Sequence, residues 1–263
     1  MDTTALPTGL IERAIAGLEA DHNVIGVILG GSFTRGEANH YSDVDFARIV
    51  REVEPGLEWH RFHYDSGRLV CLSLHSFAVL QARLSTPSEA IWEVPAMRTA
   101  QIVLDREGQI AALKQAAIDF KWEPLQPAAD AYASYLLYDN VELAHKLLGK
   151  LTTGNQDATM RATRMLVSGA SEAIAVQRGL LIEAPNNFYN LLQVTVGREA
   201  LWTYHYRAAQ GYDQNTTHEQ AVAALHLYLE TVRLLAVAIQ PEHRVVIEQA
   251  LRLIAEKLLA EPT

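Results

Sequence analysis

One group of glycine, serine and aspartate residues has the types and spacing of a phosphate and metal site. Its members are Gly30, Gly31, Ser32, Asp43 and Asp45. Glycine lets a backbone approach a bulky polyanion, and successive amide groups can bind phosphate oxygens. Two carboxylates separated by one strand residue point to the same face, where they can bind Mg²⁺ together with substrate phosphates. The group therefore predicts a metal–nucleotide site for phosphoryl-type transfer.

The predicted strands that must position this group lie in the first half of the chain. The apolar, β-branched run 24–29 predicts a buried strand that ends at the two glycines, and 44–50 predicts a second strand that begins between the aspartates. The turn signal at 65–67 predicts a hairpin of 61–64 and 68–74. A further strand is expected at 101–104, and the apolar stripe of 8–20 predicts a helix.

The pattern changes near residue 123, after which almost every segment is predicted to be helical. Helices are expected at 127–151, 157–178, 186–209, 217–239 and 243–259. Short links between long helices favour an antiparallel bundle. The prolines at 124 and 127 mark a domain junction. We predict an α+β protein with a mixed-sheet domain at 1–123 and an all-α helical bundle at 124–263.

The charge balance and the hydrophobic content of the chain argue against two classes, proteins that bind long nucleic acids and disordered proteins. The 263 residues include 22 Lys and Arg against 31 Asp and Glu, which gives a formal net charge of −9. This balance disfavours long nucleic acids, whose binding needs clustered cations. Hydrophobic residues make up 49% of the chain, enough for a substantial core, so wholesale disorder is excluded.

The single cysteine and the absence of long apolar runs bear on the cellular compartment. Cys71 has no partner for an internal disulfide, and no cysteine-based zinc motif is possible. No run of about 18 apolar residues predicts a membrane span. The polar start Met1–Thr4 does not resemble a signal peptide. We therefore expect a soluble cytoplasmic protein.

The site pattern also carries a family resemblance. Gly31-Ser32, ten further residues and Asp43-Val44-Asp45 resemble the signature of the nucleotidyltransferase superfamily that includes DNA polymerase β. The longer strings 31–37 and 41–46 are most similar to the lincosamide nucleotidyltransferases, with the aminoglycoside adenylyltransferases as relatives.

The resemblance implies an enzyme, its cofactor and its partners. ATP or another nucleoside triphosphate would be the donor, bound with Mg²⁺, and a nucleoside monophosphate would pass to a hydroxyl of a small molecule such as a lincosamide or aminoglycoside antibiotic. Asp43 and Asp45 would be the catalytic metal ligands, and Gly30, Gly31 and Ser32 would hold the phosphates. The helical domain would bind the acceptor or form a homodimer.

Arg35, in the loop between glycines and aspartates, has two interpretations. It can reach a triphosphate, or it can be an ordinary exposed loop arginine.

One departure from the family pattern is visible. The resemblance implies a third carboxylate on a later strand, as metal ligand or as base, but the expected strand 68–74 contains no Asp or Glu. The nearest acid is Asp65 in the predicted turn. Glu89 and Glu93 are predicted to lie on the surface of a helix. A non-catalytic nucleotide-binding or regulatory module is therefore the first alternative.

A toxin-type nucleotidyltransferase acting on RNA or protein is the second alternative. Arg198 and His205 fit the loose Arg-x₄₋₆-His pattern of HEPN ribonucleases, although such matches are frequent by chance. The acidic composition argues against RNA.

Overall fold

A mixed sheet of five strands lies in the N-terminal part of the chain, in the strand order β3-β4-β2-β1-β5. The computed structural model describes residues 6–16, 18, 21–54, 56 and 58–259. The strands are β1 Val24–Gly30, β2 Val44–Val50, β3 His60–Asp65, β4 Arg68–Ser76 and β5 Gln101–Asp105. Strands β2 and β4 are parallel, and the other neighbouring pairs are antiparallel. The mixed sheet confirms the sequence-based fold class.

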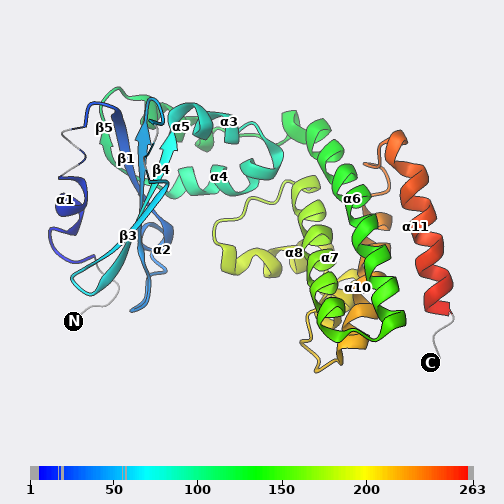
Figure 1. Ribbon diagram of the computed structural model, residues 1–263. Helices are drawn as coiled ribbons and strands as arrows, with labels where there is room; N and C mark the ends of the chain where they lie inside the picture. Colours follow the sequence, from blue (N-terminus) through cyan, green and yellow to red (C-terminus); the bar gives the residue numbers. More distant parts are fainter. Residues whose placement is uncertain (1–5, 17, 19–20, 55, 57, 260–263) are drawn as a thin grey trace. The chain divides into compact units, whose positions relative to one another are not determined.

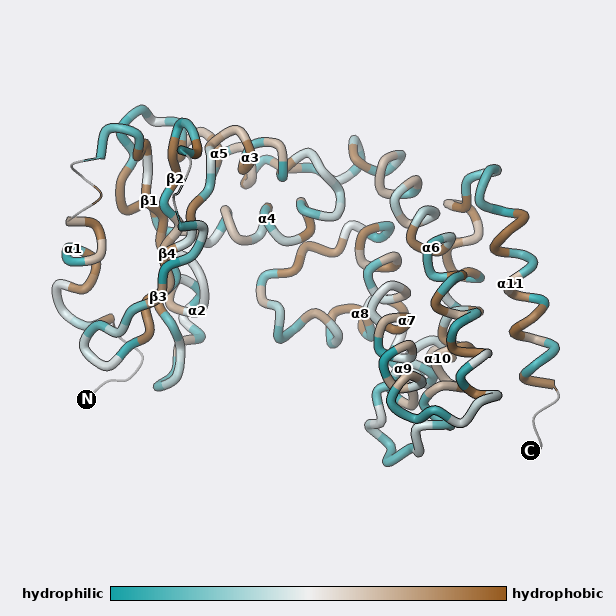
Figure 2. Tube along the Cα trace, in the orientation of Figure 1, coloured by the Kyte–Doolittle hydropathy of each residue, from teal (hydrophilic) through white to brown (hydrophobic). Residues whose placement is uncertain are grey.

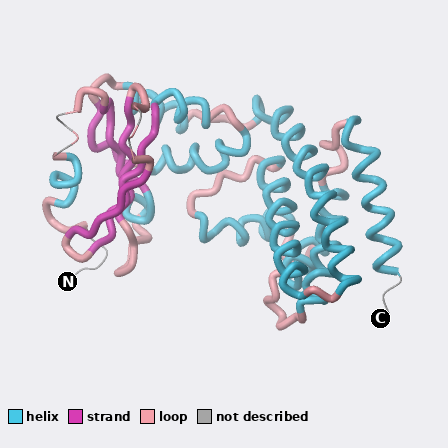
Figure 3. Tube along the Cα trace, viewed as in Figure 1, coloured by secondary structure: helices cyan, strands magenta, loops and turns pink. Residues whose placement is uncertain are grey.

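The chain divides into two compact units, one of which is discontinuous in sequence. The first contains Met1–Trp122 together with Leu181–Pro185, and the second contains Glu123–Leu180 and Asn186–Thr263. Figure 3 shows that, among the described residues, the strands lie in the first unit. A single cut after residue 123 therefore leaves the short segment Leu181–Pro185 outside the unit to which it belongs.

The helices of the first unit lie on both faces of the sheet. They are α1 Leu10–Ile15, α2 Gly31–Arg35, α3 Phe77–Arg83, α4 Pro87–Thr99 and α5 Gln109–Ile118. In Figure 1, α1 lies on one side of the strands and α4 on the other. The prediction of a helix over 8–20 is too long, because α1 ends at Ile15; residues 17, 19 and 20, like the polar start Met1–Thr4, lie outside the described residues.

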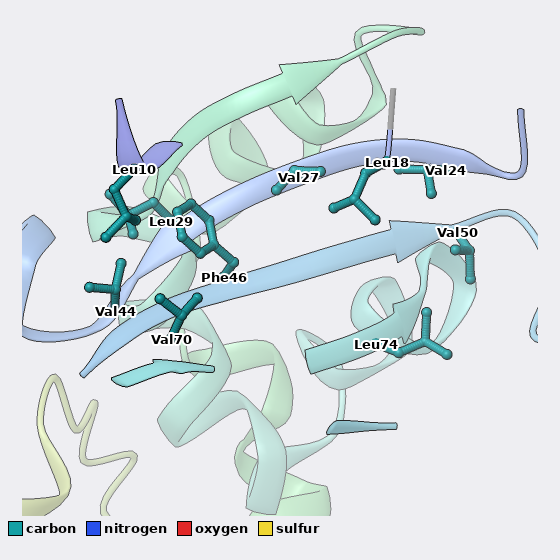
Figure 4. Close-up of a cluster of buried hydrophobic side chains, with 10 residues drawn as sticks. All are labelled: Leu10, Leu18, Val24, Val27, Leu29, Val44, Phe46, Val50, Val70 and Leu74. Carbon is teal, nitrogen blue, oxygen red and sulfur yellow. The ribbon is translucent and has the colours of Figure 1, made fainter. Parts of the chain in front are cut away.

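Alternation along the strands sends one set of apolar side chains to the face that α1 covers, called here the α1 face. The buried cluster on this face comprises Leu10, Leu18, Val24, Val27, Leu29, Val44, Phe46, Val50, Val70 and Leu74. Figure 4 shows them gathered over β1, β2 and β4. Burial of side chains of this size stabilises the fold by about 1.5–3 kcal/mol each. Figure 2 shows β1 as strongly hydrophobic, as expected for a central strand with helices on both faces.

The β3–β4 hairpin confirms the turn predicted at 65–67, except that Asp65 is the last residue of β3 and pairs with Arg68. Ser66 and Gly67, the two residues between them, have positive φ, 52° and 79°, as a two-residue type I′ turn requires. The hairpin reverses the chain so that β4 lies parallel to β2, with Asp45 beside Cys71 in the register.

Helix α4 contains an internal proline, and the returning segment compensates for it. Pro95 has no amide hydrogen, so the carbonyl of Ile91, four residues earlier, has no helical donor. The amide of Ile182 donates to this oxygen at 2.7 Å. Ile182 is itself buried. The segment Leu181–Pro185 thus completes the hydrogen bonding of a helix that lies about 90 residues earlier in the sequence.

The second unit consists of packed helices. They are α6 Gln126–Thr153, α7 Gln156–Gln177, α8 Phe188–Val196, α9 Leu201–Ala209, α10 Thr217–Leu234 and α11 Pro241–Leu259. Helix α7 packs on α6 and α10, α9 packs on α10, and α11 packs on α6. Hydrophobic and hydrophilic segments alternate along α11 (Figure 2), as expected for a helix with one buried face.

The prediction of a single helix over 186–209 is wrong. The structure has a 3₁₀ turn at Pro185–Asn187 and then two helices, α8 and α9, separated by residues 197–200. Gly197 has a φ of 111°, a conformation that favours glycine and ends the first helix. In the part of the chain that the structure describes, no helix is long and apolar enough to cross a membrane.

Two buried threonines give a matched test of the helical core. The indole Nε1 of Trp202 donates to Thr231 Oγ1 at 2.9 Å, and both residues are buried. We expect Thr231→Val to lower the free energy of unfolding by about 1–3 kcal/mol, because it leaves the indole donor buried without an acceptor. Chemical denaturation of the purified variants measures this change.

Thr163→Val is the control, since the buried Thr163 hydroxyl makes no hydrogen bond. This substitution should leave the stability unchanged or raise it. Equal losses in the two variants would contradict the assignment.

Candidate functional site

Asp45 and Gly31 contact each other where β1 and β2 pair. Gly30 pairs with Asp45 in the antiparallel register, and Gly31 is the next residue in the chain. A Cβ atom on Gly31 would lie 2.2 Å from Asp45 Oδ2, and the φ of Gly31 is +72°. Both the contact and the dihedral require glycine. A Cβ atom on Gly30 would meet nothing within 4 Å, so crowding does not require glycine there.

Asp43 and Asp45 form a pair of like charges at the start of β2. Burial raises the pKa of Asp45, the negative charge of Asp43 raises it further, and the Arg35 guanidinium opposes both. Because a carboxylate pair of this kind is destabilised by its own charge, a divalent cation that prefers oxygen ligands would stabilise the two groups. Among the described residues, no group of three or more His, Cys, Asp or Glu side chains could hold a metal ion.

The loop that leads to Asp43 is held by Arg68, whose role the sequence did not reveal. Arg68 is only 8% exposed. Its Nη1 donates to the carbonyls of Asn39 and His40 at 2.6 and 2.8 Å, and its guanidinium lies 5.5 Å from the centre of the Phe33 ring. A fixed charge inside this loop restricts its conformation and hence the position of Asp43.

Ser32 and Arg35 lie in helix α2, directly after the glycines. Ser32 is in the first turn, where amide hydrogens have no acceptor within the helix, and its carbonyl accepts from Glu37 at 2.9 Å. Arg35 Nε lies 2.8 Å from Glu37 Oε2. Since Arg35 also lowers the pKa of Asp45, its positive charge lies close to the carboxylate pair.

Strand β4 places Cys71 where a neighbouring carboxylate was expected. Cys71 pairs with Asp45 in the parallel register, so the two side chains lie on the same face of the sheet. We call it the carboxylate face, and it also carries Ser73 and His75. Burial raises the pKa of the Cys71 thiol, and the charges of Asp45 and Asp43 raise it further. The alternation of β4 could have predicted this placement, but the sequence does not show which strand lies beside β2.

The carboxylate face continues from Cys71 along β4 as a polar row. Ser73 Oγ lies 3.1 Å from His75 Nε2, and His75 Nδ1 lies 3.4 Å from Arg83 Nη1. Burial lowers the pKa of His75 to about 4, with further contributions from Arg83 and His60. His75 is therefore neutral at physiological pH.

The structure assigns the other acidic candidates to ion pairs. Both oxygens of Asp65 accept from Arg13 of α1, at 2.8 and 2.9 Å, which lowers the pKa of Asp65 to about 2. Asp65 thus faces the α1 side of the sheet. Glu93 Oε2 lies 3.4 Å from Arg83, and the more exposed Glu89 lies 3.7 Å from the same residue.

The sequence predicts one helix that carries both Arg198 and His205. In the structure, the two residues do not lie on the same helix. Arg198 lies between α8 and α9 and donates to Asn190 at 2.8 Å. His205, in α9, stacks on His226 of α10 with ring centres 4.7 Å apart. The two residues therefore take part in separate contacts.

Comparisons with known proteins find a matching domain family and a similar fold. Residues 11–86 match the family model of the nucleotidyltransferase domain. The matched range contains α1 from its second residue, strands β1 to β4 and the carboxylate pair. It also contains the glycine turn, so the family match covers the whole predicted phosphate and metal site.

One similar solved structure is a nucleotidyltransferase-like protein from Exiguobacterium sibiricum 255-15. It is 14% identical, the match covers 87% of this chain and 75% of that chain, and the TM-score is 0.56. This likeness shows a nucleotidyltransferase-like fold. A search among curated proteins finds no significant match.

The single cysteine gives a test of the site geometry. Replacement of Asp45 with Asn removes a negative charge beside Cys71, so the pKa of the thiol should fall and its alkylation at a fixed pH should become faster. The rate of iodoacetamide labelling against pH, followed by mass spectrometry, measures the shift.

Asp65→Asn is the control for the alkylation test, because Asp65 is paired with Arg13 on the α1 face. Its labelling profile should match that of the wild type. An unchanged profile in Asp45→Asn would contradict the juxtaposition of Cys71 and Asp45.

Proposed function

We propose that this protein transfers a nucleoside monophosphate from a nucleoside triphosphate, ATP in the first instance, to a hydroxyl of a small molecule. The observation that carries the proposal is the contact of Asp45 with the glycine-only position 31. This contact holds a carboxylate pair beside a turn whose amides are free of helical acceptors. The family match over residues 11–86 supports the same reaction class.

The proposed roles follow from the chemistry of each group. Asp43 and Asp45 would hold a divalent cation, Mg²⁺ being the best match to two carboxylates and phosphate oxygens. Such an ion supplies charge neutralisation and alignment for an in-line displacement. Gly31 and Ser32 would bind the β- and γ-phosphates, with Gly30 leaving room for their approach. Arg35 would add positive charge near the triphosphate.

The reaction balances as a single displacement. The acceptor oxygen forms a bond to the α-phosphorus, the bond from this phosphorus to the bridging oxygen breaks, and pyrophosphate leaves. The proton of the acceptor hydroxyl passes to solvent or to a nearby base. An antibiotic of the lincosamide or aminoglycoside class is the proposed acceptor, and we propose that the helical unit contributes to acceptor binding or to a homodimer.

A second candidate function is supported by Cys71. A thiol with a raised pKa is neither a hard metal ligand nor a carboxylate base, so Cys71 cannot replace the third carboxylate that the family resemblance implies. In this second model the protein binds the metal–nucleotide complex without turnover. Calorimetric binding of MgATP without pyrophosphate release in the presence of any acceptor would favour this model, and Cys71→Asp, which adds a carboxylate beside Asp45, would then confer release.

Substitution of the carboxylates tests the first model. We expect Asp43→Asn and Asp45→Asn each to lower pyrophosphate release by at least about 100-fold, because each removes a charge that holds the cation. The measurement is a coupled pyrophosphate assay with MgATP or MgGTP and a panel of hydroxyl acceptors. Asp65→Asn, on the α1 face, should retain wild-type release; full activity in Asp45→Asn would refute the assigned roles.

Two glycines of similar conformation separate the role of the Asp45 contact from backbone strain. Gly31 and Gly36 have φ of +72° and +71°, but only at Gly31 would a Cβ atom meet a neighbour. We expect Gly31→Ala and Gly36→Ala to lose about 1 kcal/mol of stability each from the left-handed backbone. Only Gly31→Ala should weaken Mg²⁺-dependent ATP binding, measured by calorimetry, because it displaces the Asp45 carboxylate. Equal binding losses would show that the Asp45 contact has no special role.

A further inference from the structure

Strand β3 carries an exposed aromatic pair on the carboxylate face. Phe62 pairs with Cys71, and Cys71 pairs with Asp45, so all three side chains lie on one face of the sheet. Asp65 of β3 bonds to Arg13 on the opposite face, which places Phe62 and Tyr64 on the carboxylate face by alternation. Their exposed fractions are 60% and 77%.

The electrostatic contacts support the same placement. His60 is close enough to His75 of β4 to lower its pKa, and the His60 ring stacks on Phe62 with centres 6.4 Å apart. The rings of His60, Phe62 and Tyr64, called here the β3 aromatic surface, therefore continue the face that bears the carboxylates. Phe62 is two strands from Asp45, roughly 10 Å at about 4.8 Å per strand.

The geometry of an in-line displacement assigns a substrate to this surface. If the leaving phosphates bind at the glycine turn, at the end of β1, the attacking oxygen must approach the α-phosphorus from the side opposite the leaving group. In the strand order β3-β4-β2-β1, the opposite side of Asp45 is β4 and then β3. The acceptor would therefore lie above these two strands.

We propose that the β3 aromatic surface binds the ring of a hydroxyl-bearing acceptor, with Phe62 and Tyr64 as the contacting side chains. This inference rests on the proposed function. Exposed aromatic faces bind planar rings and the apolar faces of sugar-like rings, and the contact leaves the hydroxyl free to attack the α-phosphorus. Phe62 and Tyr64 are thus specificity-determining residues that do not touch the reacting phosphorus.

The size of the surface favours a small molecule over a protein partner. Two aromatic side chains can bury at most about 300–500 Å², whereas a stable protein interface buries about 800 Å² on each partner. On the other face of the same strand, Arg61 and His63 are polar. The apolar surface of β3 is therefore confined to one face of the strand.

The experiment compares Phe62→Ala, Tyr64→Ala and the double variant with His63→Ala, an exposed control on the opposite face of β3. The acceptor KM is measured by pyrophosphate release with kanamycin and lincomycin as ring probes, and MgATP affinity is measured by calorimetry. We expect the KM for the acceptor to rise about 10-fold or more in the double variant, with MgATP affinity unchanged. His63→Ala should match the wild type in both measurements.

Ligand-detected NMR of the same probes gives a readout that does not depend on turnover. Saturation transfer from the wild type to kanamycin or lincomycin should be lost in the double variant and retained in His63→Ala. If no acceptor supports pyrophosphate release, the proposed function fails, while this binding measurement still tests the surface.

Several results would overturn the inference. Weaker MgATP binding in Phe62→Ala would assign the rings to the donor base. A change from dimer to monomer in sedimentation would assign them to a second copy. Failure of both ring probes to bind the wild type, or binding that is equal in all variants, would leave the β3 aromatic surface without a role in acceptor recognition.

Discussion

The contact between the Asp45 carboxylate and the Cα of Gly31 is the constraint on which the candidate site depends. It exists because β1 and β2 pair antiparallel with Gly30 opposite Asp45. The turn that follows β1 therefore passes directly beside the Asp45 carboxylate. A side chain at position 31 would separate the turn from the carboxylate. The apolar α1 face beneath, with Val44 and Phe46 buried, fixes the register that produces the contact.

The remaining features of the site follow from the strand order. The β3–β4 hairpin reverses the chain, and β4 then pairs with β2 in parallel, so Cys71 lies beside Asp45. Arg68, at the start of β4, holds the carbonyls of the loop that leads to Asp43. One strand therefore both restrains the carboxylate loop and supplies the side chain beside Asp45.

The sequence predicted those parts that local chemistry determines. Strands β1 and β2, the Ser66-Gly67 hairpin and the long helices follow from periodicity and turn residues. It could not predict the buried loop contacts of Arg68, because an arginine that opens a strand is ordinarily exposed. The division of 186–209 at Gly197 was missed because glycine within a helical pattern is often tolerated. The face of Cys71 relative to Asp45 depends on a parallel pairing that no local signal records.

The hydrogen bond from Ile182 to Ile91 has a consequence for how this fold can be divided or recombined. Helix α4 contains Pro95 and obtains its missing donor from a segment encoded between two helices of the other unit. A replacement of the helical region must therefore keep the segment between α7 and α8. This segment supplies the amide that donates to the Ile91 carbonyl, and it carries the buried side chain of Ile182. The hydrogen bonding of α4 in the first unit therefore depends on a segment that the sequence places between α7 and α8 of the second unit.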